Sequence, residues 1–307
     1  MQATDYGSRD AFITTQTYSV VRKLDGISPD RFAAYWRDVH GPLCARLPGL
    51  GFYVQHHFDR TNRAHLWPAH KDIKRIDLDF DGAVEIGFDS EDNAARFSSA
   101  SPVLFDDEVN LFGWDAAYSL PNGSRTLLDE DPDPSPNGPD RLHRIHLYLN
   151  GRRGDGFSEG VDDFAKSLGR SGPVIKLRVH KPETFDNDHP LPPSPVPHEV
   201  REDMLRIAVL EVGFATALSA RQFFGSREFL RISQVQPDYV KGMGACLVSH
   251  VYTFVRNGCI TLAGLRGSST AELITRMGAE NHARKEVTSL FVSGGASIEN
   301  PSIVSMA

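Results

Sequence analysis

A short pattern that occurs twice constrains the fold of this chain more than any other feature. Residues 84–97 read VEIGFDSEDNAARF and residues 210–223 read LEVGFATALSARQF. Four residues of the first copy return at one constant offset, namely Glu85, Gly87, Phe88 and Phe97 as Glu211, Gly213, Phe214 and Phe223. Since repetition at a fixed period indicates a duplicated structural unit, we expect two copies of one unit.

The elements predicted around each copy follow the same order. The first half predicts strands over 16–24, 51–59, 77–88 and 115–120, with helices from Ser28 and over 90–99. The second half predicts strands over 142–150, 174–181, 204–214 and 246–256, with helices over 158–169 and 219–230. Both halves read βαββαβ, the ferredoxin-like unit, whose sheet carries helices on one face only. We therefore predict an α+β fold in which two such sheets face each other around a barrel-like interior.

Proline and acidic residues divide the chain into domains. Residues 128–139 read LDEDPDPSPNGP, a composition that excludes a helix or a central strand and predicts a linker. The predicted domains are a first repeat over 12–127, a second, diverged repeat over 140–260, and a helical extension with a tail over 261–307. Insertions at 60–75 and 182–201 have the length of functional lids, with disorder as the alternative.

Composition and charge exclude several classes of partner. The 307 residues carry a net charge of -7, which argues against a nucleic-acid partner. The chain has no apolar run long enough to span a membrane and no recognisable signal peptide, so we expect a cytoplasmic protein without a membrane partner. Three cysteines at wide spacings fit neither a disulfide framework nor a zinc motif.

The segment from Val21 to His57 resembles a known family. The residues that carry the resemblance are RKLDGISP from Arg22, Phe32, YW at 35–36, HGPL from His40, Pro48, and YVQHH from Tyr53. Together they resemble the EthD family of the dimeric α+β barrel superfamily. The resemblance covers the first repeat, whereas the second repeat lacks the His-Gly-Pro sequence.

This resemblance implies a fold and a class of chemistry. It implies two ferredoxin-like repeats fused as an intramolecular dimeric α+β barrel. It also implies small oxygenated organic substrates, such as polyketides or degradation intermediates, handled without a cofactor. The superfamily hosts several reactions, so the fold alone does not fix one.

His40 is the first candidate catalytic residue. Ser28-Pro29 predicts a helix start, and Phe32, Trp36, Val39 and Leu43 then follow at helical spacing. Trp36 and His40 share a face, and His40 precedes a Gly-Pro pair that should kink or end the helix. A histidine near the negative end of a helix dipole titrates close to neutral pH and suits acid–base catalysis. The alternative is a histidine that only caps free carbonyls.

Strand alternation predicts the remaining site residues. Tyr53, Gln55 and His57 share one face of their strand, and we expect them to line the interior, with Phe52 and Val54 towards the helices. Tyr53 and His57 are predicted to be catalytic. The predicted substrate-binding residues are Trp36, Gln55, Glu85, His146, Tyr148, Arg178, His180 and His250. Glu85 and Glu211 are also expected to serve as buried partners for an arginine or a histidine.

Several functional readings remain open at this point. The first is a lyase of dehydratase type that needs no cofactor and uses histidine acid–base catalysis, with an isomerase or a cyclase next. A haem enzyme with His250 as axial ligand and a non-catalytic binding protein are the rivals. We predict no metal, because no local ligand motif occurs and only a site built from distant histidines is left open. The expected partner is a small molecule, and the expected state is a monomer or a homodimer.

Overall fold

The first repeat forms a four-stranded antiparallel sheet. The structure is a computed structural model and describes residues 11–61, 66–131, 133–152, 154, 156–190 and 194–291. The strands are β1 (Thr15–Lys23), β2 (Phe52–Phe58), β4 (Gly82–Phe88) and β5 (Phe112–Leu120), paired in the order β5-β1-β4-β2. This is the strand order of a ferredoxin-like unit.

The second repeat has the same topology. Its strands are β8 (His143–Gly151), β9 (Val174–His180), β10 (Ile207–Phe214) and β11 (Val240–Arg256), paired in the order β11-β8-β10-β9. The repeated glutamates take equivalent positions, since Glu85 lies opposite Tyr18 of the first strand of its repeat and Glu211 lies opposite His146. The predicted fold class, two ferredoxin-like repeats in one chain, is confirmed.

Two connections join the sheets into a barrel. The long strand β11 pairs with β8 along Val240–Leu247 and with β2 along Val248–Val255. On the other side, β5 continues past the short turn at 121–124 into β6 (Arg125–Asp129), which pairs with β9. Each sheet therefore reaches the other through the end of its fourth strand, as predicted for an intramolecular barrel. Three short strands also pair with β11, namely β3 (Lys74–Arg75), β7 (Asn137–Pro139) and β12 (Cys259–Ile260).

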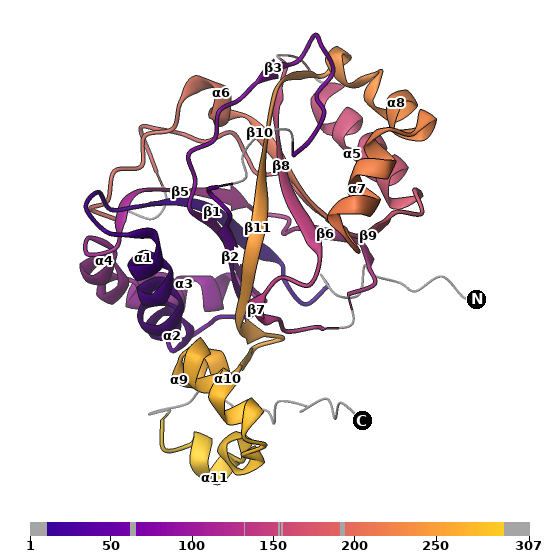
Figure 1. Cartoon of the computed structure of the whole chain (residues 1–307). Helices are drawn as coiled ribbons and strands as arrows, with labels where there is room; N and C mark the ends of the chain where they lie inside the picture. The colour runs from indigo at the N-terminus through magenta and orange to yellow at the C-terminus, as the bar shows by residue number, and fades with distance from the viewer. Residues whose placement is uncertain are drawn as a thin grey trace.

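Helices cover the outside of the barrel on two flanks (Figure 1). The first flank holds α1 (Pro29–Tyr35), the π-helix η2 (Trp36–His40), α2 (Gly41–Ala45), α3 (Glu91–Ala100) and α4 (Pro102–Glu108). The second flank holds α5 (Gly156–Gly169), α7 (Ala217–Phe224) and α8 (Arg227–Ser233). Among the described residues, no helix is long and apolar enough to cross a membrane.

Short helical segments complete the chain. They are α6 (Glu202–Leu205), η3 (Gln236–Asp238), α9 (Leu262–Arg266), α10 (Ser268–Arg276), η4 (Glu280–Ala283) and α11 (Lys285–Thr288). The predicted helical extension consists of short helices, and Gly278 takes a positive φ of 61° after α10 and ends that helix. The helix predicted over 219–230 is likewise two helices, since α7 ends at Gly225 and the Ser226 hydroxyl caps α8.

Some predicted strand limits are also wrong. Residues 77–81 precede β4 without pairing as a strand, and Met204 belongs to α6 rather than to β10. Strand β11 begins at Val240, six residues before its predicted start at Cys246. The glycines at 242 and 244 disguised this strand, although each allows β11 to approach the segment 74–78 closely.

Apolar residues pack in three layers. One layer lies between the first sheet and its helices, and a second lies between the second sheet and its helices. The third fills part of the barrel interior and includes Val20, Val54, Tyr118, Val209 and Val248. The remaining interior is polar, and it contains Glu85, His146 and Glu211, each at most 1% exposed.

Candidate functional site

A π-turn shapes the helix that carries His40. The Ser28 side chain caps α1 by accepting from the backbone N–H of Arg31, as the sequence predicts. The chain then widens into η2, where the backbone N–H of Gly41 bonds to the carbonyl of Trp36. The wider turn rotates Val39 outward, so that it is 47% exposed and not in the predicted apolar stripe. Trp36 and His40 both stay buried.

His40 forms a close pair with a carboxylate. Its Nδ1 lies 2.9 Å from Oδ2 of Asp107 on α4, and Oδ1 of Asp107 accepts a hydrogen bond from the Tyr35 hydroxyl. The helix continues into α2, so His40 does not cap a helix end, and that alternative is wrong. The hydrogen bond with His40, followed by the bond from Tyr35, holds the pKa of Asp107 below its usual range.

Two further carboxyl groups behave in the opposite way: Glu108 follows Asp107 on α4, and Asp115 lies on β5. Burial raises the pKa of Glu108, although the Ser194 hydroxyl donates to it at 2.6 Å. Burial and the negative charge of Glu108 raise the pKa of Asp115 to about 8. The cluster thus combines an ionised carboxylate at Asp107 with a carboxylic acid at Asp115. Titratable groups with pKa values pushed apart in this way are typical of acid–base sites.

The insertion of the second repeat covers this cluster. Ser194 bonds to Glu108, and the backbone N–H of Asp115 bonds to the carbonyl of Pro197 at 3.0 Å. The Trp114 indole donates to the carbonyl of Glu199 at 2.9 Å. The predicted lid at 182–201 therefore lies over the site of the other repeat. In the first insertion, 60–75, residues 62–65 lie outside the described residues.

The face predicted for Tyr53, Gln55 and His57 is wrong. These side chains point towards the helices, and Phe52 and Val54 point into the barrel. The His57 ring stacks on Trp36 at 4.4 Å between centroids. His57 Nε2 lies 3.2 Å from Oε1 of Gln55, whose amide donates to the Tyr53 hydroxyl at 2.7 Å. Polar residues occupy both faces of β2, so polarity alone did not identify the interior face.

The other predicted residues on this outer face come from β11. Tyr252 meets the edge of the His57 ring at 4.9 Å, and Phe254 stacks on Tyr53 at 5.0 Å. His250 stacks on Tyr252 and is half-buried. Burial, followed by the charge of His250, holds the pKa of His57 well below its usual range. His57 is therefore neutral at physiological pH.

The predicted second-repeat residues of β8 and β9 do line the barrel interior, whereas the same prediction for His250 of β11 is wrong. Arg178 donates to Oε2 of Glu85 at 2.9 Å, and His180 lies 3.9 Å from the same oxygen. The Tyr18 hydroxyl contacts Nδ1 of His146 at 2.7 Å and the Tyr148 hydroxyl at 2.8 Å. The structure therefore brings five of the predicted substrate-binding residues together, namely Glu85, His146, Tyr148, Arg178 and His180.

The repeated glutamates are buried ion-pair partners, as expected. Glu85 pairs with Arg178, and Glu211 pairs with Arg144 at 2.8 Å. Arg178 is the first cause that lowers the pKa of Glu85, and Arg144 is the first that lowers that of Glu211, in both cases against the effect of burial. Burial holds the pKa of His146 well below its usual range and lowers that of His180 to about 4. The interior therefore combines ionised acids with neutral imidazoles.

Sequence reasoning missed Asp107, Asp115 and His56 as site residues. Asp107 belongs to an acidic run on α4 that resembles a solvated helix face, so no sequence signal identified it. The repeat in the sequence did contain a signal for His56. His56 pairs next to Glu85 on β4, and His180 pairs next to Glu211 on β10, so the two histidines occupy equivalent positions. The three cysteines, all among the described residues, form no disulfide, as expected.

Comparison with known proteins gives one family match. The model of the EthD domain matches residues 24–112. No curated protein matches the chain significantly. Among solved structures, a putative monooxygenase from Fusobacterium nucleatum subsp. nucleatum ATCC 25586 is 9% identical, with a TM-score of 0.46 over 78% of this chain and 92% of the other.

Two further solved structures have similar scores. An anthrone oxidase-like protein is 8% identical, with a TM-score of 0.47 over 78% of this chain and 92% of the other. A putative monooxygenase from Lactobacillus acidophilus NCFM is 9% identical, with a TM-score of 0.42 over 78% of this chain and 95% of the other. At such low scores and identities, these similarities assign no activity to this chain. The family match covers part of the chain: residues 24–112 match the model of the EthD domain, and this segment contains both His40 and Asp107.

Proposed function

We propose that the protein is a lyase of dehydratase type, which acts on a small oxygenated organic metabolite with His40 as its general base. The observation that carries the proposal is the 2.9 Å contact between Nδ1 of His40 and Oδ2 of Asp107, inside the EthD domain. A carboxylate on one ring nitrogen fixes the tautomer and leaves the other nitrogen as the proton acceptor.

Each proton that moves in the proposed reaction has a donor and an acceptor. Asp107 is ionised and accepts Nδ1–H of His40, so Nε2 takes a proton from the carbon next to a substrate carbonyl. Asp115 has a pKa of about 8 and is protonated at neutral pH, so it can donate to the leaving hydroxyl. A carbon–carbon double bond forms as the carbon–oxygen bond breaks, and water leaves. The proton held by His40 then returns to Asp115 through solvent.

The roles predicted for Tyr53 and His57 remain proposals. Both face the same side of the sheet as the helix that carries His40, and Trp36 lies against His57. A neutral His57 can donate a hydrogen bond but carries no charge to offset an enolate, so we assign it to orientation of the substrate. Tyr53 supports the developing oxyanion through its hydroxyl.

Substrate entry requires the insertion at 182–201 to move. His40, Glu108 and Asp115 are all buried beneath the bonds from Ser194 and Pro197. Loops that close over a site exclude water and complete the catalytic arrangement. The insertion therefore serves as the lid of the site in the first repeat.

Comparative mass spectrometry of the host, with and without the gene, tests this function. The compound that accumulates without the gene is incubated with the pure protein, and the expected product is lighter by one water. His40→Gln should slow its formation by roughly a hundredfold or more. The matched control is His70→Gln, because His70 also lies near a carboxylate, 3.4 Å from Asp72, but at the surface.

Two outcomes would contradict the proposal. A product of equal mass with a changed retention time would indicate an isomerase or a cyclase. A compound that binds and is recovered unaltered would indicate a binding protein.

A further inference from the structure

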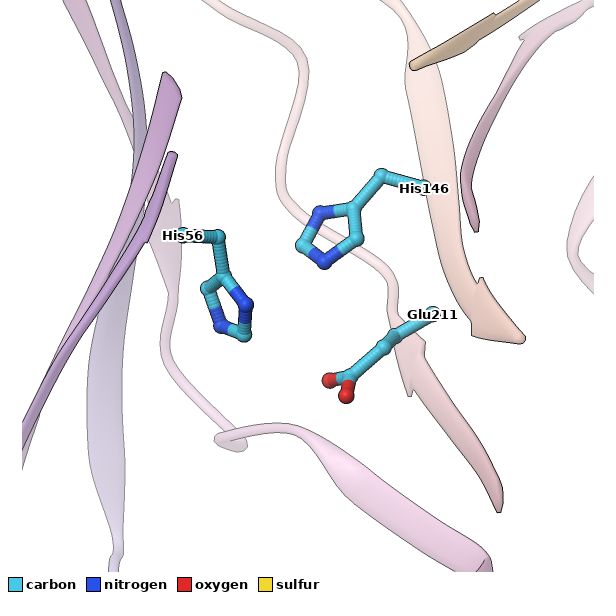
Figure 2. Close-up of side chains that lie close together, drawn as sticks. All are labelled: His56, His146 and Glu211. Carbon is cyan, nitrogen blue, oxygen red and sulfur yellow. The ribbon is translucent and has the colours of Figure 1, made fainter. Parts of the chain in front are cut away.

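Three potential metal ligands converge inside the barrel, on the opposite face of β2 from the site described above. His56 comes from β2, His146 from β8 and Glu211 from β10, and one donor atom of each lies within 4.8 Å of the other two. Figure 2 shows the three side chains directed towards a common point. Each residue is at most 2% exposed. Three different strands thus aim imidazole and carboxylate donors at one place.

The two imidazoles each leave one nitrogen without a partner. Nδ1 of His56 and Nε2 of His146 are buried and have no hydrogen bond. The opposite nitrogens are both held, Nε2 of His56 at 3.4 Å from Glu85 and Nδ1 of His146 at 2.7 Å from Tyr18. Buried polar atoms without partners are rare and costly. A carboxylate or hydroxyl behind a metal-binding histidine is the usual support that orients the ring.

The charge around Arg144 also favours a cation. Its guanidinium contacts three carboxylates, those of Glu211 at 2.8 Å, Asp140 at 2.8 Å and Asp131 at 3.2 Å. Lys176 also acts on Glu211, but Lys176 is itself paired with Asp129 at 3.0 Å, so the acids still outnumber the bases around Glu211. A divalent cation next to Glu211 would offset this excess.

We propose that His56, His146 and Glu211 bind a divalent first-row transition-metal ion. Two imidazoles and one carboxylate suit such ions and leave coordination positions for water or an exogenous ligand. Metal–ligand bonds of about 2.0–2.2 Å place the ligand atoms roughly 3.4 Å apart. Small rotations of the three side chains would therefore bring their donor atoms within bonding distance of one ion.

A pocket borders two of the three ligands, His56 and Glu211. It has a volume of about 70 Å³, and its lining includes His56, Glu85, Arg178 and Glu211. Such a volume holds a few water molecules, which is enough to hydrate the open positions of an ion. Among the described residues that line this pocket, none belongs to the insertion at 182–201.

The metal site is distinct from the proposed dehydratase site and does not depend on it. His40 and Asp107 lie among the outer helices, whereas the three ligands lie within the barrel. Metal binding is measured without a substrate, so it can be found even if the dehydratase assignment is wrong. Equally, failure to bind a metal would not affect the dehydratase assignment.

Titration of the whole, chelator-treated protein with Co²⁺ tests the site. We expect one ion per chain and a visible absorption band from Co²⁺ with nitrogen and oxygen ligands. His146→Gln should weaken Co²⁺ binding by roughly a hundredfold or more. The matched control is His180→Gln, an equally buried interior histidine whose Nε2 also lacks a partner, and binding should change by less than about threefold.

Several results would overturn the proposal. One is the absence of stoichiometric Co²⁺ binding by the wild-type chain, and another is unchanged binding by folded His146→Gln. Loss of binding in His180→Gln alone would place the ion at the neighbouring group of Glu85, His180 and Glu211 instead. If His146→Gln does not fold, X-ray absorption of the Zn²⁺-loaded wild type decides the matter. Two imidazole ligands are expected, and a sulfur ligand would contradict the assignment.

Discussion

The pairing of His40 with Asp107 determines what this histidine can do. An ionised Asp107 stabilises the tautomer with its proton on Nδ1 and the imidazolium that forms during proton transfer. Asp107→Asn removes that charge with little change in shape. We expect kcat to fall by roughly a hundredfold to ten-thousandfold with a smaller change in KM, measured by steady-state kinetics on the accumulating compound.

The control for this prediction lies one residue away. Asp106 is exposed on the same helix, and Asp106→Asn should leave kcat within about twofold of the wild type. Equal kinetics in the two variants would show that Asp107 has no role in proton transfer.

Asp115 should give the protein a distinctive dependence of stability on pH. Its folded-state pKa of about 8 exceeds the ordinary value of 3.8, so the folded state binds the proton more tightly. The stability from this group is fully present below pH 3.8 and is lost as the pH rises through about 8. The loss is at most about 1.4 kcal/mol per pH unit.

Asp115→Asn tests this dependence because an amide resembles the protonated acid. Relative to the wild type, the variant should gain in free energy of unfolding from pH 4 to pH 8, measured by chemical denaturation at each pH. A constant difference across this range would mean that Asp115 keeps an ordinary pKa in the folded state.

At the residue scale, the sequence predicted which side chains form ion pairs better than it predicted which face of a strand lines the interior. Recurrence of Glu85 as Glu211 predicted buried acids paired with a basic residue, and both pairs are present. The two faces of the strand 52–58 were assigned the wrong way round because both carry polar residues. The polar side chains on the outer face hydrogen-bond to one another through Gln55. Asp107 comes close to His40 only through the packing of α4, which no local pattern records.

At the element scale, close packing against β11 explains the glycine of the His-Gly-Pro sequence. Gly41 has an ordinary helical φ of -55°, so its backbone does not require glycine. A Cβ there would lie 2.5 Å from Cζ of the buried Phe254 on β11. Glycine is therefore needed so that the helix can approach β11 closely, and this approach keeps His40 beside α4.

Gly41→Ala should accordingly destabilise the protein despite the higher helix propensity of alanine. We expect a loss of about 1–3 kcal/mol in the free energy of unfolding, measured with urea. Gly225→Ala is the control, because its nearest contacts would be ordinary ones at 3.7 Å, and the change should stay within about 0.5 kcal/mol. Equal stability of the two variants would contradict the close-approach explanation.

Strands were predicted more accurately than helices at this scale, for a physical reason. Period-two alternation of polar and apolar residues in β1, β8 and β9 locates each strand within about two residues. Helix breaks depend instead on single caps such as Ser226 and on a positive φ at Gly278, which the periodicity does not reveal. The widened turn at Trp36–His40 arises from tertiary packing and has no sequence period of its own.

Closure of the barrel within one chain governs the stability of the whole molecule. The junctions β2–β11 and β6–β9 each join one repeat to the other. A break in the chain between Pro134 and Ser135 leaves both junctions intact, so the two fragments should stay together as a one-to-one complex. Light scattering coupled to gel filtration should give about the intact mass of 34.0 kDa.

Separate elution of the two nicked fragments would contradict this view of the barrel. The repeat in the sequence predicted two facing sheets, but it did not predict how they join. The long β11 and the β5–β6 turn perform that role, and glycines obscured the first while linker-like composition obscured the second.

Chemical rescue of His40→Ala is the sharpest test of the role of His40 as general base. The compound that accumulates without the gene is incubated with this variant in the presence and absence of imidazole. The account predicts a loss of roughly a hundredfold or more in the rate of water loss, partly restored in proportion to added imidazole. Full activity of the folded variant without imidazole would contradict the assignment of His40 as the general base.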